Sequence, residues 1–481
     1  MGEDLYSPEK ERDHGQETVE TLEPGVPGGR DAPADGVPGP PGGGLGPVSS
    51  GGSGRPASGT LRGSMENVRT AVIVATSGGA WEVVGGLPLC VRAALTLRAA
   101  GFREVALFTG ASAHHRAEGL RWRRDDAATH WLHSPGEAES LAADPVLVVS
   151  GDVLFEAPTL APLLVAARRD VIGMGHPPTA PGRALAATCP RAILPALLTA
   201  LDVPGATLTD TLSRVGAAEV AQVTLADGLC LPLDAAHTPA RLETALLDDL
   251  ARRTATGDSY LAALIDRRLS RPVTRLMLRL PLTPSQITVL SVLVGLAGAT
   301  GLATVSYAGR VVGVLGLIAS VVLDCVDGEV ARARFQQSAR GARLDVIGDY
   351  AVHLAVFLGL GIGLARQGLP PAGVRAVIVL ILGVVAAMAV MHALFVRPAL
   401  ARGGDLHWAG DGQSLRGTPV ATLAERLASR DYTYLFLVLA LAGHLEWFVY
   451  AGAVGAWVFV LGLVGYWLYR RAAWPRAVAS R

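Results

Sequence analysis

Hydrophobic residues follow two different patterns along this 481-residue chain. Over residues 66–255, short β-branched runs alternate with segments of helical periodicity. This alternation predicts an α/β domain with a mostly parallel sheet that helices cover on both faces. The expected strands are 68–76, 104–109, 146–150 and 220–225, and the expected helices are 89–100, 160–169, 191–201 and 239–253.

From Gln286 onward the apolar runs lengthen until each approaches the roughly 20 residues that a helix needs to cross a bilayer. Half of all residues are hydrophobic, a share that favours membrane spans over a soluble protein. The pattern predicts an all-α, six-helix transmembrane domain over residues 286–470. Its expected spans are 286–306, 309–326, 344–365, 371–396, 432–449 and 451–469.

Three further segments complete the predicted organisation. Residues 1–64 hold 16 glycines and 9 prolines with few large apolar side chains, so we expect a disordered tail. Met65 follows directly and is a second candidate start site. Residues 256–285 form a basic juxtamembrane linker between the two domains, and residues 471–481 form a terminal tail.

Arginines lie almost entirely on one side of the predicted spans. Eighteen flank the spans on the side of the two termini, whereas only Arg310, Arg366 and Arg375 lie on the opposite side. By the positive-inside rule, this bias predicts six spans in the cell (inner) membrane, with the N- and C-termini in the cytosol. Arg271, Arg275 and Arg343 are candidates to bind the phosphate group of a substrate. Ordinary flanking charge, or contact with anionic lipid headgroups, explains these arginines equally well.

The overall charge and the cysteines exclude several function classes. The formal net charge is zero, which gives no electrostatic case for nucleic acid binding. The four cysteines are far apart and have neither the spacing of a metal site nor that of a disulfide framework. Lys10 is the single lysine of the chain, so no lysine is available for catalysis in either predicted domain.

One motif between the second and third predicted spans carries candidate chemistry. It reads D-x-x-D-G-x-x-A-R-x8-G-x-x-x-D-x-x-x-D from Asp324 to Asp349. Asp324 and Asp327 are three residues apart on one helix, and Asp345 and Asp349 are four apart on the next, so each pair shares a helix face. A short turn between antiparallel helices lets the two faces meet.

Four converging carboxylates suit hard divalent cations that also engage phosphates, so we expect Mg²⁺ or Mn²⁺, with two ions in an in-line displacement. Gly328, Ala331 and Gly341 leave room for a nucleotide, and the fork-shaped Arg332 suits a phosphate. Two alternatives remain open. The acids and nearby arginines could form a buried ion-pair network, or the acids could mark the pathway of an ion-coupled transporter.

The motif resembles the signature of the CDP-alcohol phosphotransferase (CDP-alcohol phosphatidyltransferase) family at every defining position. The resemblance implies a membrane enzyme, expected to be a homodimer, that releases CMP from a CDP-alcohol donor by transferring a phospho-alcohol group to an acceptor hydroxyl. It implies metal binding by Asp324, Asp327, Asp345 and Asp349, with Asp349 also the catalytic base. It further implies a CDP site formed by Asp324, Asp327, Gly328, Ala331, Arg332 and Gly341.

A second feature common in that family is a T-P-N-x-x-T sequence at the start of the first span. Here the sequence is Thr283-Pro284-Ser285-Gln286-Ile287-Thr288, with serine in place of asparagine. This substitution leaves the role of the turn open.

The N-terminal domain resembles the sugar-nucleotide cytidylyltransferases, which implies a nucleotidyltransferase-like (Rossmann-like) fold. The two-domain order is similar to that of bifunctional inositol-phosphate cytidylyltransferase and di-myo-inositol-phosphate-phosphate synthases. The expected glycine-rich loop reads Ala75-Thr76-Ser77-Gly78-Gly79-Ala80-Trp81 and lacks its arginine, and the phosphate-binding lysine is absent. Asp152 and Asp234 remain as vestigial acids, so we expect a degenerate domain.

The substrates follow from the two-domain resemblance alone. It favours a polyol-phosphate acceptor such as inositol 1-phosphate, with either a soluble CDP-alcohol or CDP-diacylglycerol as donor. The product is then a compatible solute or a phospholipid. The alternatives are a bifunctional enzyme whose N-terminal domain also makes the CDP-alcohol from CTP, and a transporter.

Overall fold

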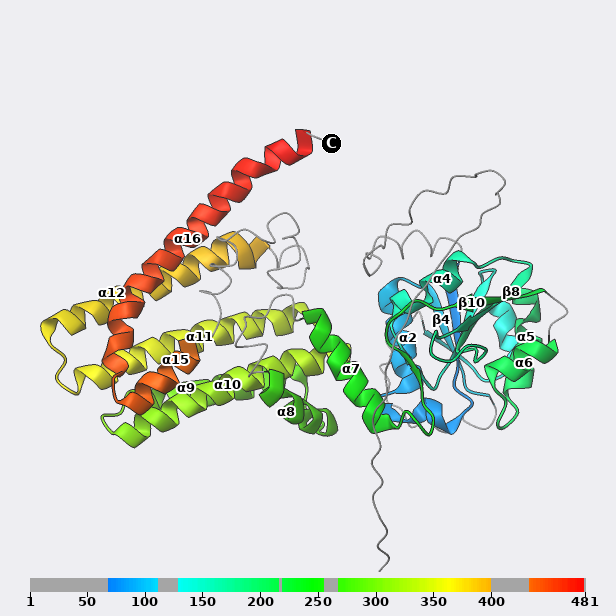
Figure 1. Ribbon diagram of the computed structural model, residues 1–481, viewed down its shortest axis with the longest axis horizontal. Helices are drawn as coiled ribbons and strands as arrows, with labels where there is room; N and C mark the ends of the chain where they lie inside the picture. Colours follow the sequence, from blue (N-terminus) through cyan, green and yellow to red (C-terminus); the bar gives the residue numbers. More distant parts are fainter. Residues whose placement is uncertain (1–67, 111–128, 216–218, 255–266, 399–431, 480–481) are drawn as a thin grey trace, which may run out of the picture. The chain divides into compact units, whose positions relative to one another are not determined.

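The computed structural model describes residues 68–110, 129–215, 219–254, 267–398 and 432–479 (Figure 1). The predicted tail 1–64, Met65 and the first part of the predicted linker lie outside these residues. The described residues comprise an N-terminal α/β region and a C-terminal helical region, as the hydrophobic pattern predicted.

The α/β region contains a seven-stranded sheet with the order β10-β8-β9-β6-β1-β4-β5. Its strands are β1 (Thr70–Val74), β4 (Glu104–Phe108), β5 (Thr129–Leu132), β6 (Val146–Ser150), β8 (Val171–His176), β9 (Ala186–Cys189) and β10 (Glu219–Thr224). Strand β1 pairs in parallel with β4 and β6, whereas β9 is antiparallel to β6 and β8. The prediction of four strands in a mostly parallel sheet is confirmed, and β5, β8 and β9 are additional to it.

Helices cover both faces of this sheet, as predicted. Alternate residues of β1 belong to two separate apolar clusters, because successive strand side chains point to opposite faces. Helices α2 (Leu89–Ala100) and α4 (Ala161–Val165) pack in one cluster, and α5 (Leu194–Leu201) and α6 (Leu208–Val215) pack in the other.

One further helix and two small strand pairs complete the described part of the region. Helix α7 (Pro239–Thr254) packs Leu242 and Leu246 into a third apolar cluster with Val84, Leu89 and Leu154. The remaining strands form two small antiparallel pairs, β2 (Val83–Val84) with β3 (Leu87–Pro88) and β7 (Val153–Phe155) with β11 (Cys230–Pro232).

In the helical region, five described helices are long and apolar enough to cross a membrane. They are α9 (Pro284–Leu302), α10 (Tyr307–Ala333), α11 (Ala339–Ala365), α12 (Pro371–Met391, continued by a π-helical turn at His392–Val396) and α16 (Leu445–Ala479). The basic helix α8 (Arg267–Arg279) precedes them, and the short apolar helix α15 (Tyr432–Ala442) precedes α16.

The boundary between the fifth and sixth predicted spans is wrong. We expected the fifth span to continue to residue 449, but α15 ends at Ala442 after 11 residues and α16 begins at Leu445. Gly443 adopts φ +76°, and its N–H donates to the Ala440 carbonyl at 3.1 Å, while His444 N–H donates to the Leu439 carbonyl at 2.8 Å. A left-handed glycine with these bonds ends a helix. Gly443, His444 and Glu446 interrupt the apolar pattern at this point of the sequence, and the helix ends at that interruption rather than beyond it.

Glycines allow α9 to lie close against both α10 and α11. A Cβ atom on Gly313 of α10 would lie 2.7 Å from the Gly298 carbonyl oxygen of α9. A Cβ on Gly359 or Gly363 of α11 would lie still closer to the carbonyl oxygens of Ala299 and Leu302, nearer than Cβ atoms approach in folded proteins. These α11 glycines therefore serve packing within the chain, where small residues let helix backbones meet.

We predict that Gly359→Ala destabilises the helical region, because the new methyl group would push α9 and α11 apart. The matched control is Gly462→Ala on α16, where an added Cβ meets nothing within 4 Å. Overpacking should cost about 1–3 kcal/mol, whereas the control should be neutral or gain up to about 1 kcal/mol from helix propensity. Thermal unfolding of the two purified variants in one detergent measures the difference, and equal midpoints would contradict this packing.

Candidate metal centre

The aspartate motif lies on two consecutive helices joined by a short turn. Helix α10 ends at Ala333 with Asp324 and Asp327 in its last three turns, and α11 begins at Ala339 with Asp345 and Asp349 in its first three. Ser338 caps α11 by accepting a hydrogen bond from the Gly341 N–H at 3.0 Å. The motif's second glycine therefore lies in the first turn of α11, where the chain reverses direction.

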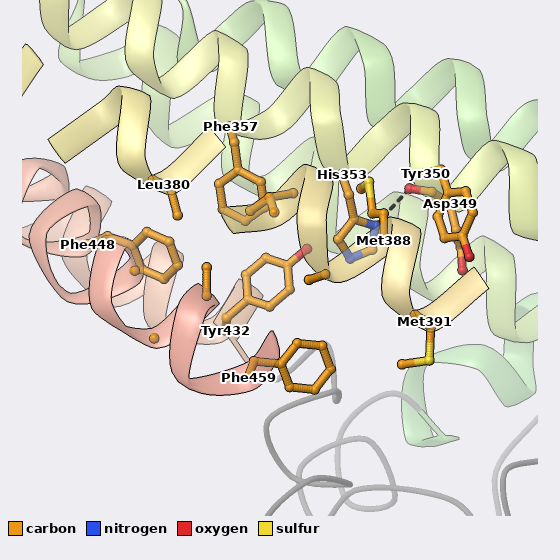
Figure 2. A pocket seen from close by; sticks show the side chains of 15 residues that line it. Asp349, Tyr350, His353, Phe357, Leu380, Met388, Met391, Tyr432, Phe448 and Phe459 are labelled. Carbon is orange, nitrogen blue, oxygen red and sulfur yellow. Dashed lines mark hydrogen bonds between the residues drawn. The ribbon is translucent and has the colours of Figure 1, made fainter. Parts of the chain in front are cut away.

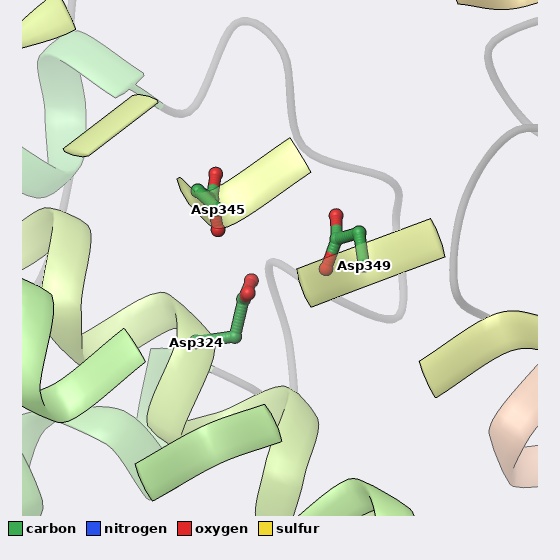
Figure 3. Close-up of side chains that lie close together, drawn as sticks. All are labelled: Asp324, Asp345 and Asp349. Atoms are coloured by element: carbon green, nitrogen blue, oxygen red, sulfur yellow. The ribbon is translucent and has the colours of Figure 1, made fainter. Parts of the chain in front are cut away.

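Three of the four carboxylates meet. Asp324, Asp345 and Asp349 each offer an oxygen atom, and these atoms lie within 4.8 Å of one another (Figure 3). All three residues are half-buried. Figure 3 shows the carboxyl groups of the two α11 residues and the one α10 residue directed toward a common space. Hard oxygen donors in this arrangement fit Mg²⁺ or Mn²⁺, so the residues present suit the predicted cation.

Asp327 occupies a different place from these three. It is 7% exposed, and its Oδ2 accepts a short hydrogen bond from Thr288 Oγ1 on α9. Residues three apart differ by about 60° around a helix, so Asp324 and Asp327 diverge slightly. That divergence directs Asp327 toward α9 and Asp324 toward α11.

The Thr-Pro-Ser-Gln sequence, whose role was open, forms the start of α9. The Thr283 side chain accepts from the Gln286 N–H, and the Gln286 side chain accepts from the Thr283 N–H at 2.9 Å. This reciprocal pair is a capping box, with Pro284 at the first helical position. The box starts α9 one turn before Thr288, the residue that bonds Asp327. Nothing in the sequence indicates Thr288 as a partner of the motif, although the T-x-x-Q spacing is a visible signal for the helix start.

The small residues and arginines predicted to bind CDP or a phosphate lie in different environments. A Cβ on Gly328 would lie 3.1 Å from an Arg332 guanidinium nitrogen, so the Arg332 side chain extends back along α10 over that glycine. A Cβ on Gly341 would lie 3.9 Å from Ser285 Oγ, which brings the α9 turn beside the motif. Ala331 is half-buried. Of the acceptor-phosphate candidates, Arg271 and Arg343 are exposed and Arg275 is half-buried.

A cavity that the sequence did not predict extends from Asp349 between α11, α12, α15 and α16 (Figure 2). Its volume of about 400 Å³ falls within the range of small-molecule pockets. The end next to the motif carries Asp349, Tyr350 and His353, and the rest is mainly aliphatic, aromatic and methionine side chains. Polar and apolar parts of one ligand could therefore be bound together here.

His353 connects this cavity to the motif. Its Nδ1 lies 2.8 Å from the backbone carbonyl oxygen of Asp349, one turn earlier on α11. Because a carbonyl oxygen can only accept, Nδ1 carries the proton in this arrangement. The ring also packs edge-on against Tyr432 of α15, with centroids 5.8 Å apart. His353 was not among the predicted site residues, because a lone histidine in an apolar run carries no spacing signal.

The two acids of the α/β region are held by local contacts. Asp152 accepts from Ser150 Oγ at 2.6 Å. Asp234 pairs with Arg183 at 2.8 Å and accepts from the His237 N–H at 2.9 Å. Burial alone would raise the pKa of Asp234, but these hydrogen bonds hold it below its ordinary value. Among the described residues, Asp152 and Asp234 belong to no cluster with metal-ligand geometry.

The loop that corresponds to a glycine-rich nucleotide loop is closed by its own side chains. Gly78–Trp81 forms a 3₁₀ turn, and Trp81 Nε1 donates to the Ala75 carbonyl at 2.9 Å. Arg92, the nearest buried guanidinium, donates to the Val84 carbonyl at 2.7 Å and the Gly85 carbonyl at 3.1 Å. Trp81 therefore holds the backbone of its own loop, and Arg92 of α2 holds the backbone between β2 and β3.

Comparisons with known proteins agree with the motif. Residues 281–468 match the family described as CDP-alcohol phosphatidyltransferase. A curated relative, the bifunctional IPC transferase and DIPP synthase of Thermococcus kodakarensis, is 37% identical over 95 residues, which are 20% of this chain and 21% of the relative. The match thus spans about a fifth of that relative's length.

Two solved structures are also similar to parts of the chain. Mycobacterium tuberculosis phosphatidylinositol phosphate synthase, in complex with manganese and citrate, is 25% identical and covers 42% of this chain and 87% of its own, with a TM-score of 0.30. The inositol-1-phosphate CTP transferase of T. maritima is 10% identical and covers 37% of this chain and 97% of its own, with a TM-score of 0.29.

The resemblance that the motif from Asp324 to Asp349 indicated is thus confirmed over residues 281–468, where this chain matches the CDP-alcohol phosphatidyltransferase family.

Proposed function

We propose that this protein is a membrane-embedded, divalent-metal-dependent CDP-alcohol phosphotransferase. It transfers a phospho-alcohol group from a CDP-alcohol to the hydroxyl of an acceptor alcohol and releases CMP. The observation that carries the proposal is the convergence of the Asp324, Asp345 and Asp349 oxygens within 4.8 Å, inside the segment that matches the family.

The proposed roles follow the chemistry of each side chain. Asp324, Asp327, Asp345 and Asp349 bind two Mg²⁺ or Mn²⁺ ions, which when bound supply positive charge for a diphosphate and its leaving group. Asp349 also takes the proton of the acceptor hydroxyl. Its place at one end of the cavity supports this role, because a hydroxyl group bound at that end would contact Asp349. Thr288 orients the Asp327 carboxylate.

The CDP moiety is proposed to lie along Gly328, Ala331, Arg332 and Gly341, with Asp324 and Asp327 beside it. Glycines at Gly328 and Gly341 let a nucleotide approach the helix backbones closely. Arg332 lies over Gly328 and offers a planar, charged donor to a phosphate. Arg271, Arg275 and Arg343 remain candidates for the phosphate of the acceptor.

The preferred acceptor is a polyol phosphate such as inositol 1-phosphate. The name of the Thermococcus kodakarensis relative, which includes IPC transferase and DIPP synthase activities, supports this class. The donor is either a soluble CDP-alcohol or CDP-diacylglycerol. The mainly apolar cavity beside Asp349 favours a donor or acceptor with a hydrocarbon chain.

We propose six membrane crossings, with both termini in the cytosol and the motif at the cytosolic ends of the second and third. The arginine bias supports this topology. In this scheme α15 belongs to the fifth crossing. A homodimer is also proposed. Because Gly359 and Gly363 pack against α9 within the chain, the dimer contact must use other surfaces.

The N-terminal domain is proposed to have the cytidylyltransferase fold without its activity. The lack of any lysine in the domain supports this proposal, since a triphosphate needs cationic donors. The bonds of Asp234 to Arg183 and His237 support it too, because they occupy a carboxylate that a metal would need. The second candidate is a bifunctional enzyme, favoured by the name of the curated relative.

Asp349→Asn should abolish CMP release while leaving the protein folded, because the amide cannot accept the hydroxyl proton. A general base contributes about 10²–10⁴-fold, so we expect a loss of at least that size. The assay uses purified full-length protein with Mg²⁺ and a panel of CDP-alcohols and acceptors, with the product identified by mass. Glu446→Gln, which changes a half-buried acid in the first turn of α16 that pairs with His444, is the control.

Retained CMP release by Asp349→Asn would contradict the proposed base. If the wild-type protein forms no CMP from any donor in the panel but carries ions across vesicle membranes, the transporter alternative is correct.

A second measurement decides between the degenerate and the bifunctional domain. Full-length Asp349→Asn protein, given CTP and inositol 1-phosphate with Mg²⁺, should release no pyrophosphate, because the nucleotide loop lacks its arginine and the domain has no lysine. Pyrophosphate release that disappears in the double variant with Asp152→Asn would establish the bifunctional alternative.

A further inference from the structure

Glu329 is a buried carboxylate that the proposed chemistry does not use. It lies on α10, two residues after Asp327 and three before Arg332, and is 7% exposed. Burying a carboxylate is costly unless its oxygens are hydrogen-bonded. Glu329 is therefore either a structural anchor or a residue that serves the neighbouring site.

The partners of Glu329 come from the helix that precedes the first span. Ser270 Oγ donates to Glu329 Oε1 at 3.0 Å, and Thr274 Oγ1 donates to Glu329 Oε2 at 2.5 Å. Both hydroxyl residues are fully buried and lie four apart on α8, so they share one face of that helix. Each carboxylate oxygen thus accepts a charge-assisted hydrogen bond. Together the two bonds fix the rotation of α8 about its axis and its position along α10.

Arg334 makes a second attachment just beyond the end of α10. Its guanidinium donates to the carbonyl oxygens of Leu278 and Leu280, each at 2.9 Å, and of Leu282 at 2.6 Å. Carbonyls at the end of a helix have no partner within the helix, and a cation there satisfies them. Arg334 therefore fixes the end of α8 and the turn that leads into α9.

A third attachment reaches the metal centre itself. The turn that Arg334 holds ends at Thr283, the N-cap of α9, and Thr288 in the next turn donates to Asp327. Asp327 thus binds Thr288, Glu329 binds Ser270 and Thr274, and Arg334 binds the carbonyls of the section 278–282 between them. The position of Thr288 relative to Asp327 depends on how α8 and its turn are held.

We propose that Glu329 is a positioning residue for the metal centre. Glu329 holds Ser270 and Thr274, and this fixes where α8 and the turn leading into α9 lie along α10. That placement keeps Thr288 bonded to Asp327. The inference rests on the proposed metal-dependent function, but it concerns a residue outside the ligand set. A purely structural anchor would contribute to stability alone.

The test measures the affinity of full-length protein in lipid nanodiscs for Mn²⁺ in the absence of substrate. Electron paramagnetic resonance monitors the binding directly. Glu329→Ala should weaken Mn²⁺ binding about 10-fold or more, the effect typical of residues that orient metal ligands. Thr288→Val should weaken it comparably. The matched control is Tyr307→Phe, which removes the 3.0 Å bond from α10 to the Leu441 carbonyl at the opposite end of the helix. It should lower the melting temperature without changing Mn²⁺ affinity.

Two further variants keep the test decisive if Glu329→Ala does not fold. Ser270→Ala combined with Thr274→Val removes the same bonds from the α8 side and should weaken Mn²⁺ binding similarly. Glu329→Gln, which keeps one acceptor oxygen, should recover part of the affinity. Wild-type Mn²⁺ affinity in a folded Glu329→Ala or Ser270→Ala/Thr274→Val protein would overturn the positioning role and leave the proposed function intact. If the wild-type protein binds no Mn²⁺, the proposed function itself fails.

Discussion

The repulsion among three closely placed carboxylates is the constraint on which the helical region depends. At the distances that separate the Asp324, Asp345 and Asp349 oxygens, each pair of charges repels by about 3–4 kcal/mol at an effective dielectric constant near 20. A fold that holds such a group needs rigid helices to keep the acids together and positive charge to compensate them. A bound divalent cation would meet the second need, and the packing of α9, α10 and α11 meets the first.

Helix α9 provides that rigidity from both sides. Its backbone lies against Gly313 of α10 and Gly359 of α11, so the two helices that carry the acids share one support. The capping box at Thr283 sets where α9 begins, and Thr288 then reaches Asp327. The capping residues that start α9 thus help to determine where Asp327 lies in the candidate site.

Much of the fold could be read from the sequence because it rests on periodicity. The strands around β1 and β6 and the long helices α9 to α12 follow directly from apolar runs. The break between α15 and α16 was placed wrongly although Gly443, His444 and Glu446 interrupt the apolar run, because composition does not show at which residue the backbone turns left-handed. Strand β9 was missed for a similar reason, since a short central strand of small residues has little β signal of its own.

The same distinction between local pattern and distant contacts applies to the candidate site. Spacing along a helix predicted that all four aspartates of the motif would converge, and Asp324, Asp345 and Asp349 do lie together. The spacing could not reveal that Asp327 turns toward Thr288, or that a mainly apolar cavity reaches Asp349, because both depend on contacts between distant segments. Nothing in the sequence pattern indicates a role for Glu329, and Arg334 contributes there only to the arginine bias. Their bonds to α8 depend on how that helix lies against α10.

The most direct test of the account is a crystal structure of the protein soaked in Mn²⁺, with anomalous scattering measured at the manganese edge. The account predicts an anomalous peak between Asp324, Asp345 and Asp349, at about 2.0–2.2 Å from their oxygens, a distance typical of such hard divalent cations. A map from fully loaded crystals with no peak there, or with these side chains directed to separate arginines, would contradict it.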